Sequence, residues 1–319
     1  ALPILLMHST PSQAATSLLM VRPVKFCYNE ETALDNAFMN NIYSNPASSQ
    51  AKACQEFDNY VSILKSKGVE VAVFEDTLVP HKPDSIFPNN WISFHEDGTI
   101  VTYPMKAENR RAERREDIIE GLQQKFNYKI TNKIDISAEE NEDRFLEGTG
   151  SIIFDYQNKI AYACVSQRTH KDVLESIAKK LGFKAHTFLS VDENGKEIYH
   201  TNVMMCLGER FAMVCMQSIH SEVDKENLLN SLRETGHEVV MLTYEQIRHF
   251  AGNALEVANS KGERFLIVSK SGYDILTEDQ RAVIQQYDEI VPIPLETIET
   301  IGGGSARCMI SDIRLPRNA

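Results

Sequence analysis

The chain has 319 residues, of which 42% are hydrophobic and 24% charged, and this balance excludes an intrinsically disordered protein. No apolar run approaches the roughly 18 residues that a membrane-spanning helix needs, so we expect no membrane span. The formal net charge of -12 would repel a phosphate backbone, so we expect no nucleic acid among the partners.

A strand–turn–strand–helix–strand pattern recurs along the chain and predicts a protein built from repeated units. The first copy has predicted strands at 91–94 and 99–103 and a helix at 110–126. The next three copies keep this order, with strands 151–155, 160–165 and 184–189 and helix 171–181; strands 203–207, 211–216 and 237–242 and helix 222–235; and strands 255–259, 264–269 and 289–292 and helix 277–287.

The two ends of the chain supply the parts of a fifth copy. Its predicted elements are a C-terminal strand at 309–315, a strand at 18–25, helices at 32–41 and 49–67, and a strand at 69–74. Pairing of the two terminal strands would close the chain into a ring and cover the exposed sheet edges. The sequence therefore predicts an α+β propeller, with five strand–strand–helix–strand units around a pseudo-fivefold axis in a single domain over residues 1–319. The alternative is a generic α/β protein with chance similarity between its segments.

The cysteines indicate a reducing compartment. All six are spaced irregularly, without a Cys-x-x-Cys pair or a zinc-like Cys/His cluster, so we expect neither a disulfide scaffold nor a structural metal. Cys164, Cys206 and Cys215 lie in apolar runs and are expected to be buried. Residues 1–19 hold a short apolar run without a basic region, which predicts a surface-lying segment and a cytoplasmic protein.

An unusual polar segment precedes the first strand of every unit. These segments are 84–90, 144–150, 200–202, 251–253 and 302–308. Equivalent positions in a ring of five units surround one axis, so their side chains would converge at one end of that axis. Convergent polar groups in a concave site are typical of an active site.

Cys308, His200 and Glu147 are the candidates for chemistry. A lone cysteine is usually a buried spectator, but three glycines precede Cys308 at close range and Arg307 is adjacent. Glycine lets a ligand approach the backbone, and a nearby cation favours the thiolate. His200 would be its acid/base partner, although a single histidine is more often structural. Glu147 either caps a turn or orients the histidine.

Arginines in two other segments are candidates for anion binding. Arg168 is most simply interpreted as a solvated side chain, and the functional alternative is that it binds a carboxylate. Arg110 and Arg111 belong to a mixed-charge stretch that predicts a mostly solvated helix face, so they carry less weight.

Together these segments resemble the pentein, or amidinotransferase-like, superfamily, over nearly the whole chain. That superfamily includes arginine and agmatine deiminases, dimethylarginine hydrolases, succinylarginine dihydrolases and glycine amidinotransferases. The matching motifs are Gly-Gly-Ser-Ala-Arg-Cys at 303–308, Leu-Glu-Gly-Thr-Gly at 146–150, Ser-Gln-Arg-Thr at 166–169, Asp-Ser-Ile-Phe at 84–87, His-Thr-Asn at 200–202 and Ala-Gly-Asn-Ala-Leu-Glu at 251–256. Each motif is weak alone, but their common order is specific. The pattern is most similar to the citrulline-utilisation hydrolase branch.

The resemblance implies a Cys-dependent hydrolase of non-peptide C–N bonds, acting on the guanidino or ureido group of an arginine-derived small molecule. It implies Cys308 as the nucleophile, His200 as the proton donor to the leaving nitrogen, and Glu147 as the residue that holds the histidine. The other substrate-binding residues that it implies are Asp84, Asn90 and Asn202 at the head group, Arg168 and Arg110 at the α-carboxylate, and Asn253. It implies no metal and no cofactor.

The sequence departs from the deiminase pattern at Asn90 and Asn202, where deiminases commonly have acids. Two amides in place of carboxylates remove two negative charges, which favours a neutral ureido group over a cationic guanidinium. We therefore expect citrulline as the substrate, giving ornithine, carbon dioxide and ammonia.

Three alternatives stay open. An arginine or modified-arginine deiminase or dihydrolase is one, because Asp84 can still meet a cation. An amidinotransferase and a catalytically silent pentein that acts as a binding protein are the others. A homo-oligomer also stays open, whereas we expect no membrane partner.

Overall fold

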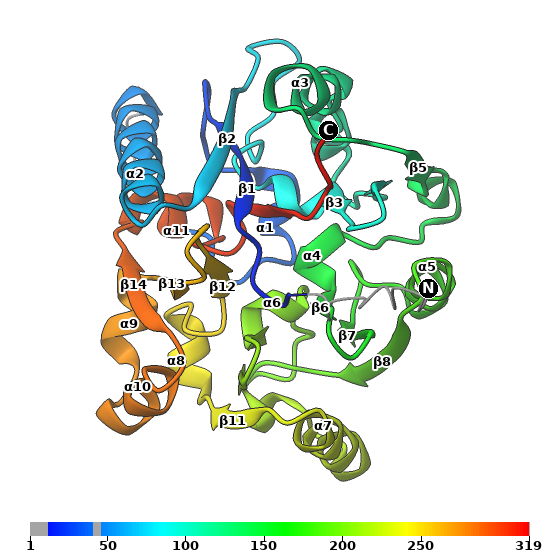
Figure 1. Ribbon diagram of the computed structural model, residues 1–319, viewed down its shortest axis with the longest axis vertical. Helices are drawn as coiled ribbons and strands as arrows, with labels where there is room; N and C mark the ends of the chain where they lie inside the picture. Colours follow the sequence, from blue (N-terminus) through cyan, green and yellow to red (C-terminus); the bar gives the residue numbers. More distant parts are fainter. Residues whose placement is uncertain (1–11, 41–45, 319) are drawn as a thin grey trace, which may run out of the picture.

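The computed structural model describes residues 12–40 and 46–318, and its sheets are arranged as a ring around one axis (Figure 1). There are five three-stranded sheets among these residues. In each sheet the middle strand pairs antiparallel with one neighbour and parallel with the other. A parallel pair needs a crossover connection, and the helices at the rim provide it (Figure 1). The predicted propeller of five units is confirmed.

The two ends of the chain close the ring. Strand β15 (Ser311–Ile313) pairs antiparallel with β1 (Ser17–Arg22), with Leu18 opposite Asp312. Strand β1 also pairs in parallel with β2 (Glu70–Glu75), which follows the long helix α2 (Pro46–Ser66). The predicted pairing of the terminal strands is therefore confirmed.

The other four units follow the predicted order. Their elements are β3 (Ile92–Phe94), β4 (Thr99–Thr102), α3 (Glu116–Phe126) and β5 (Asn132–Asp135); β6 (Ile153–Asp155), β7 (Ile160–Val165), α5 (Lys171–Lys180) and β8 (Lys184–Leu189); β9 (Met205–Leu207), β10 (Phe211–Val214), α7 (Glu222–Glu234) and β11 (Glu238–Met241); and β12 (Leu255–Ala258), β13 (Arg264–Ser269), α10 (Glu278–Ile284) and β14 (Glu289–Ile293). Helix α3 buries an apolar stripe of Ile118, Ile119 and Leu122 in a core cluster that also holds residues of β2, β3 and β4.

The predicted helix at 32–41 is wrong over most of its length. Helix α1 spans only Glu30–Ala33, and residue 41 lies outside the described residues. The side-chain oxygen of Asn36 accepts a hydrogen bond from the backbone N–H of Phe38 at 3.0 Å. Such local side-chain bonds compete with helical ones and favour turns.

The predicted helix at 110–126 is interrupted. A 3₁₀ helix (Glu108–Glu113) comes first, and α3 begins only at Glu116. Arg110 and Glu113 of the 3₁₀ helix are buried together as an ion pair, so this turn faces inward.

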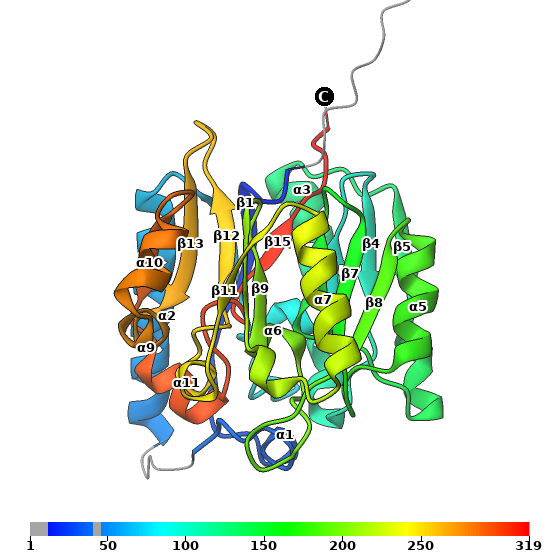
Figure 2. The ribbon, with the colours of Figure 1, turned by 90° about the horizontal axis from the view of Figure 1, so that it is seen from below.

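Several short helices were not predicted. Helices α4 (Gly148–Ser151) and α6 (Thr201–Met204) replace the beginnings of two predicted strands. The others are α8 (Tyr244–Arg248), α9 (Lys270–Ile275) and α11 (Glu296–Gly302). Figure 2 shows α1, α6 and α11 toward one end of the propeller, opposite to the C-terminus.

The predicted burial of three cysteines is confirmed. All six are free thiols, and Cys164, Cys206 and Cys215 are buried in the core. Most of the predicted surface-lying N-terminal segment falls in residues 1–11, outside the described residues. No helix in the described part of the chain is long and apolar enough to span a membrane.

A buried pair of carboxyl groups makes folding depend on pH. Glu256 of β12 and Asp288 next to β14 are 2% and 3% exposed, with Arg264 and Glu209 as their charged neighbours. Burial raises the pKa of Glu256 to about 8, and it also raises the pKa of Asp288. The folded protein therefore keeps a proton that the unfolded chain releases above about pH 4.5.

We expect the free energy of unfolding to fall as pH rises from about 4.5 to about 8, by up to about 1.4 kcal/mol per pH unit for the proton on Glu256, and to level off above that. Below about pH 6 the fall should be steeper, because Asp288 also keeps its proton in the folded protein. Urea unfolding across this window, in the parent protein and in Glu256→Gln, measures the effect. The glutamine variant removes the titrating group, so its slope should be shallower. An equal slope in both proteins would assign the pH dependence to other groups.

Candidate active site

Three of the polar segments that precede the first strands, 84–90, 200–202 and 302–308, line one small cavity. The other two reach it indirectly, through the contacts of Glu147 with His200 and of Asn253 with Cys308. The volume of the cavity is about 20 Å³, which is room for about one water molecule. Cys308 and His200 both line it, although they belong to different units. The other polar residues that line it are Thr32, Asn36, Asp84, Asn90, Arg110 and Tyr199.

His200 is held by Glu147. Its Nε2 lies 2.7 Å from Glu147 Oε2, so Nδ1 is the ring nitrogen that Glu147 does not engage. Burial alone would raise the pKa of Glu147, but the Arg168 cation and the hydrogen bond with His200 outweigh it and lower that pKa, so Glu147 is ionised. Burial lowers the pKa of His200, and Glu147 opposes this shift. A histidine oriented in this way can exchange a proton with a group in the cavity.

Two glycines let the backbone come close to these side chains. A Cβ atom at Gly150 would lie 2.3 Å from Asn90 Nδ2 and 2.9 Å from His200 Nδ1, so no side chain fits there. Gly303 has a φ of 61°, which L-residues rarely adopt, and its carbonyl accepts a hydrogen bond from the Tyr199 hydroxyl at 3.0 Å. The glycine-rich motifs thus keep Asn90, His200 and Tyr199 close together.

The thiol of Cys308 faces two side-chain amides. Asn253 Nδ2 lies 3.1 Å and Asn202 Nδ2 lies 3.5 Å from Cys308 Sγ. The sequence suggested that Arg307 would be the cation near the sulfur, but its guanidinium pairs with Asp312 at 3.2 Å. Both amides were expected to contact the substrate, and in the structure their nitrogens contact the sulfur.

Arg110 was expected on a solvated face, and it is buried instead. Its Nε and Nη2 each lie 2.9 Å from the carboxylate of Glu113, a partner that the sequence did not reveal. Its Nη1 donates a hydrogen bond to Asn90 Oδ1 at 2.9 Å. Because a guanidinium can only donate, this contact fixes the amide orientation of Asn90. Asn90 Nδ2 is buried and has no partner among the described residues.

Asp84 is held from one side only. Its Oδ2 accepts hydrogen bonds from Asn29 Nδ2 at 2.7 Å and from the Thr32 hydroxyl at 3.1 Å. Its Oδ1 is buried without a partner in the described part of the chain. The cavity is therefore bordered by Asp84, with a free acceptor, and by Asn90, with a free donor.

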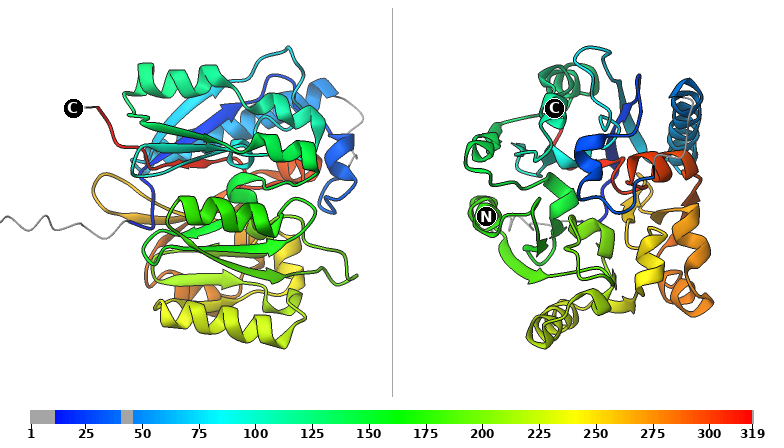
Figure 3. Two further views of the ribbon diagram at one scale, coloured as in Figure 1. Left: turned by 90° about the vertical axis from the view of Figure 1, so that its right-hand side faces the viewer. Right: turned by 180° about the vertical axis from the view of Figure 1, so that it is seen from behind.

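Arg168 lies beside Glu147 and is covered by the segment 29–36. Its guanidinium pairs with Asp35, donates an N–H to the Thr32 carbonyl at 3.1 Å, and lies 3.5 Å from Glu147 Oε2. Lys106 Nζ also contacts Asp35, at 2.6 Å. The right-hand view of Figure 3 shows the dark blue N-terminal part of the chain lying across the centre of the ring.

Asn29, Thr32, Asp35 and Asn36 lie at the site, although the sequence did not indicate them. All four belong to the segment 29–36, most of which was assigned to a helix. The available signal was the polar run itself, Asn-Glu-Glu-Thr at 29–32 and Asp-Asn at 35–36.

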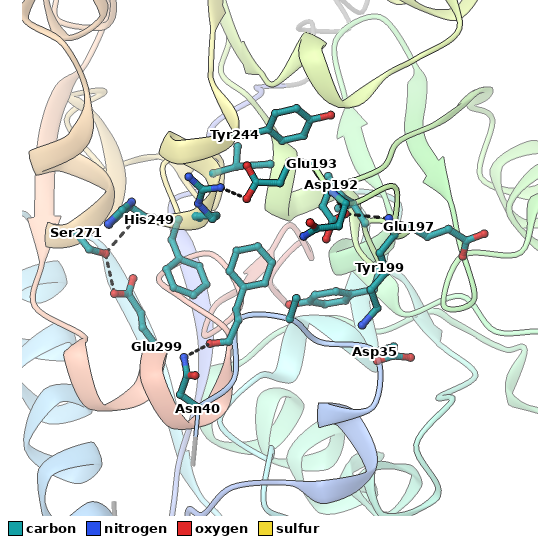
Figure 4. A pocket seen from close by; sticks show the side chains of 18 of the residues that line it. Asp35, Asn40, Asp192, Glu193, Glu197, Tyr199, Tyr244, His249, Ser271 and Glu299 are labelled. Carbon is teal, nitrogen blue, oxygen red and sulfur yellow. Dashed lines mark hydrogen bonds and ion pairs between the residues drawn. The ribbon is translucent and has the colours of Figure 1, made fainter. Parts of the chain in front are cut away.

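A larger pocket of about 440 Å³ lies next to the small cavity, and Tyr199 lines both (Figure 4). Its aromatic residues include Phe38, whose ring centroid is 6.3 Å from that of Tyr199 and 5.2 Å from that of Phe250. Asp35 lies at its edge, between the pocket and Arg168. This volume is in the range of small-molecule sites.

Comparison with known proteins identifies the class. The model of the family described as N,N dimethylarginine dimethylhydrolase, eukaryotic, matches residues 22–315. No curated protein sequence matches the chain. The five-unit propeller and this match place the chain in the pentein superfamily. More particularly, the chain belongs to the N,N dimethylarginine dimethylhydrolase family.

Solved structures share the fold. One is the apo structure of ArgZ, an arginine dihydrolase from the ornithine-ammonia cycle in cyanobacteria, with a TM-score of 0.73 and 17% identity, covering 95% of this chain and 41% of that chain. The isolated N-terminal domain of ArgZ, covalently bound to a reaction intermediate, has a TM-score of 0.71 and 18% identity. The match covers 94% of this chain and 99% of that domain. A mutant of DDAH from Pseudomonas aeruginosa, complexed with citrulline, has a TM-score of 0.64 and 14% identity. The match covers 93% of this chain and 99% of that chain. This chain thus spans about two fifths of full-length ArgZ.

Proposed function

We propose that the protein hydrolyses the ureido group of citrulline to ornithine, carbon dioxide and ammonia, as a citrulline-utilisation member of its family. Cys308 is the nucleophile, His200 is the general acid/base, and Glu147 orients the histidine. The residues proposed to bind the substrate are Asp84 and Asn90 at the head group and Arg168 at the α-carboxylate, with Arg110 holding Asn90.

The free amide of Asn90 is the observation that carries the choice of a ureido group. Arg110 occupies its Oδ1, so Nδ2 is left as a buried N–H donor beside the cavity. A ureido group has a carbonyl oxygen that can accept this hydrogen bond, whereas a guanidinium has only donors. Asp84 Oδ1 can accept an N–H from the same head group. A donor and an acceptor at one cavity match a ureido group better than a guanidinium.

The chemistry follows from the residue types. The Cys308 thiolate attacks the ureido carbon, and the C–N bond breaks as His200 gives a proton to the leaving nitrogen. The leaving nitrogen is the one on the side chain of ornithine, so the remaining carbamoyl group stays on the sulfur as an S-carbamoyl (thiocarbamate) intermediate. His200 then takes a proton from water as the water attacks the carbamoyl carbon, which frees the thiolate and releases carbamic acid. Carbamic acid breaks its remaining C–N bond to give carbon dioxide and ammonia, so one citrulline and one water give ornithine, carbon dioxide and ammonia.

An arginine deiminase or dihydrolase is the second candidate, and Asp84 is the observation that favours it. A carboxylate with a free oxygen at the cavity suits a cationic head group. The fold shared with ArgZ is compatible with this candidate as well.

Product analysis by mass spectrometry tests the proposal. The purified protein is incubated with citrulline, arginine, monomethylarginine and dimethylarginine, with Cys308→Ser as the blank. Ornithine from citrulline in preference to arginine supports the proposed function. Citrulline or ornithine formed mainly from arginine or its methylated forms would assign a deiminase or dihydrolase instead. No turnover of any substrate would leave a binding protein.

Asp35 is expected to compete with the substrate. Its carboxylate occupies Arg168 in the position that we propose for the α-carboxylate of citrulline. If this contact must break before the substrate binds, only the fraction of protein in which Arg168 is already free can bind. The apparent affinity is then the intrinsic affinity multiplied by that fraction. Asp35→Ala should therefore lower KM for citrulline by about threefold to tenfold, with little change in kcat. Steady-state kinetics measure this, and Asp35→Glu, which keeps the charge, is the control. A higher KM in Asp35→Ala would mean that Asp35 binds the substrate, for example its α-ammonium group.

A further inference from the structure

The ionisation of the Cys308 sulfur needs a cause within the protein if the proposed function holds, and the inference rests on that function. A guanidinium substrate brings a positive charge that favours a neighbouring thiolate. A ureido group is neutral and brings none. An enzyme for citrulline must therefore stabilise the thiolate with its own groups before the substrate arrives.

The cations near Cys308 are already committed to carboxylates. Arg307, the preceding residue in the chain, pairs with Asp312. Arg110, across the cavity, forms two hydrogen bonds with Glu113. His200 is bound to Glu147 through Nε2. None of these charges is free to act for the sulfur alone, so another kind of donor is required.

We propose that Asn253, with Asn202 as a second donor, holds the sulfur of Cys308 as a thiolate. The two amide nitrogens lie 3.1 Å and 3.5 Å from Sγ, and both side chains are buried. Hydrogen bonds to an ionised acceptor are about twice as strong as those between neutral groups. Asn253 is thus a catalytic residue that touches the reacting atom.

The orientation of the Asn253 amide is fixed by the backbone around it. Its Oδ1 accepts hydrogen bonds from the N–H groups of Arg307 at 3.1 Å and Cys308 at 3.3 Å. Its Nδ2 must then face the other way, where it also donates to the Asn202 carbonyl at 3.1 Å. The amide cannot flip without breaking all of these bonds. The same side chain therefore positions the cysteine loop and donates to its sulfur.

Among the described residues, the titratable and charged groups across the cavity from the sulfur are His200, Tyr199, Asp84 and Arg110. On the loop side they are Tyr60, Arg307 with its partner Asp312, and Glu299, which accepts a hydrogen bond from Ser305. None of them changes in the substitution Asn253→Asp. This variant keeps an oxygen for the two backbone N–H groups and replaces the N–H donor by an anion. It keeps the loop contacts of Asn253 while it both removes the N–H donor and places a negative charge beside the sulfur.

The test is alkylation of Cys308 by iodoacetamide as a function of pH, without substrate. Because the chain has six cysteines, the rate is read from the Cys308 peptide by mass spectrometry. In Asn253→Asp the rate near neutral pH should fall at least about tenfold, and the pH of half-maximal rate should rise. Asn202→Asp should shift in the same direction. Asn109→Asp, a half-buried position that does not line the cavity, adds the same charge as the control and should match the parent.

A profile of Asn253→Asp that coincides with that of the parent would overturn the proposal. If that variant does not fold, the test is the ultraviolet absorbance of the parent protein minus that of Cys308→Ser at neutral pH. The proposal predicts that this difference contains the absorbance of a thiolate. A difference without a thiolate signal would overturn the proposal. Because neither measurement uses a substrate, failure of citrulline turnover alone would overturn the proposed function and leave the role of Asn253 standing.

Discussion

Replacing Cys308 by serine is expected to reduce kcat/KM for citrulline by on the order of 10³-fold or more. An alcohol is a far weaker nucleophile than a thiolate at neutral pH, so no covalent intermediate should form. The side chain is almost buried and the two residue types have nearly the same shape, so the fold should be kept. Steady-state kinetics and a thermal melt of the same preparation measure both points.

The other cysteines define the control and the contradicting result. Cys54 lies on α2, half-buried and hydrogen-bonded to the Pro23 carbonyl at 3.3 Å, so Cys54→Ser should retain activity. Burial raises the pKa of Cys164 and of Cys206 to about 12 each, which keeps both as neutral thiols. If Cys308→Ser stays within about tenfold of the parent, the nucleophile has been misassigned.

The candidate site could be located from the sequence because equivalent segments of repeated units lie at equivalent places around the ring. Once the first strand of each unit is recognised, the segment before it must lie at one end of the ring. That reasoning alone brought Cys308 and His200 to one cavity, and Glu147 to His200. The end strands could be paired in the same way, because only that pairing closes the ring.

Side-chain partners could not be predicted in this way, because they depend on distances that no local pattern contains. The charges around Arg110 suggested a solvated helix face, yet Glu113, three residues later, pairs with it and lets both be buried. Asp35 stood inside a pattern that resembled a helix, and its contact with Arg168 spans 133 residues of sequence. The direction in which the Asn253 amide points is set by two backbone N–H groups of another unit.

A substitution at Asn90 is expected to change the preference of the enzyme between neutral and cationic substrates. Asn90→Asp keeps an oxygen for Arg110 and replaces the free N–H donor by a carboxylate oxygen at the cavity. A carboxylate repels the carbonyl oxygen of a ureido group and attracts a guanidinium. We expect the ratio of kcat/KM for arginine to kcat/KM for citrulline to rise by roughly 5- to 150-fold, the range for a partly desolvated charge pair. Because Arg110 offsets part of the new charge, we expect a value in the lower half of this range.

The measurement is the ratio for the two substrates in one protein, because a loss common to both cancels. Asn109→Asp is the matched control: it adds one negative charge at a residue bonded to Asn29, without lining the cavity, and should leave the ratio unchanged. A ratio that stays flat in Asn90→Asp, or moves toward citrulline, would show that Asn90 does not read the charge of the head group. Asp84 would then be the residue that decides between ureido and guanidino substrates, because its Oδ1 is the free acceptor beside the same cavity.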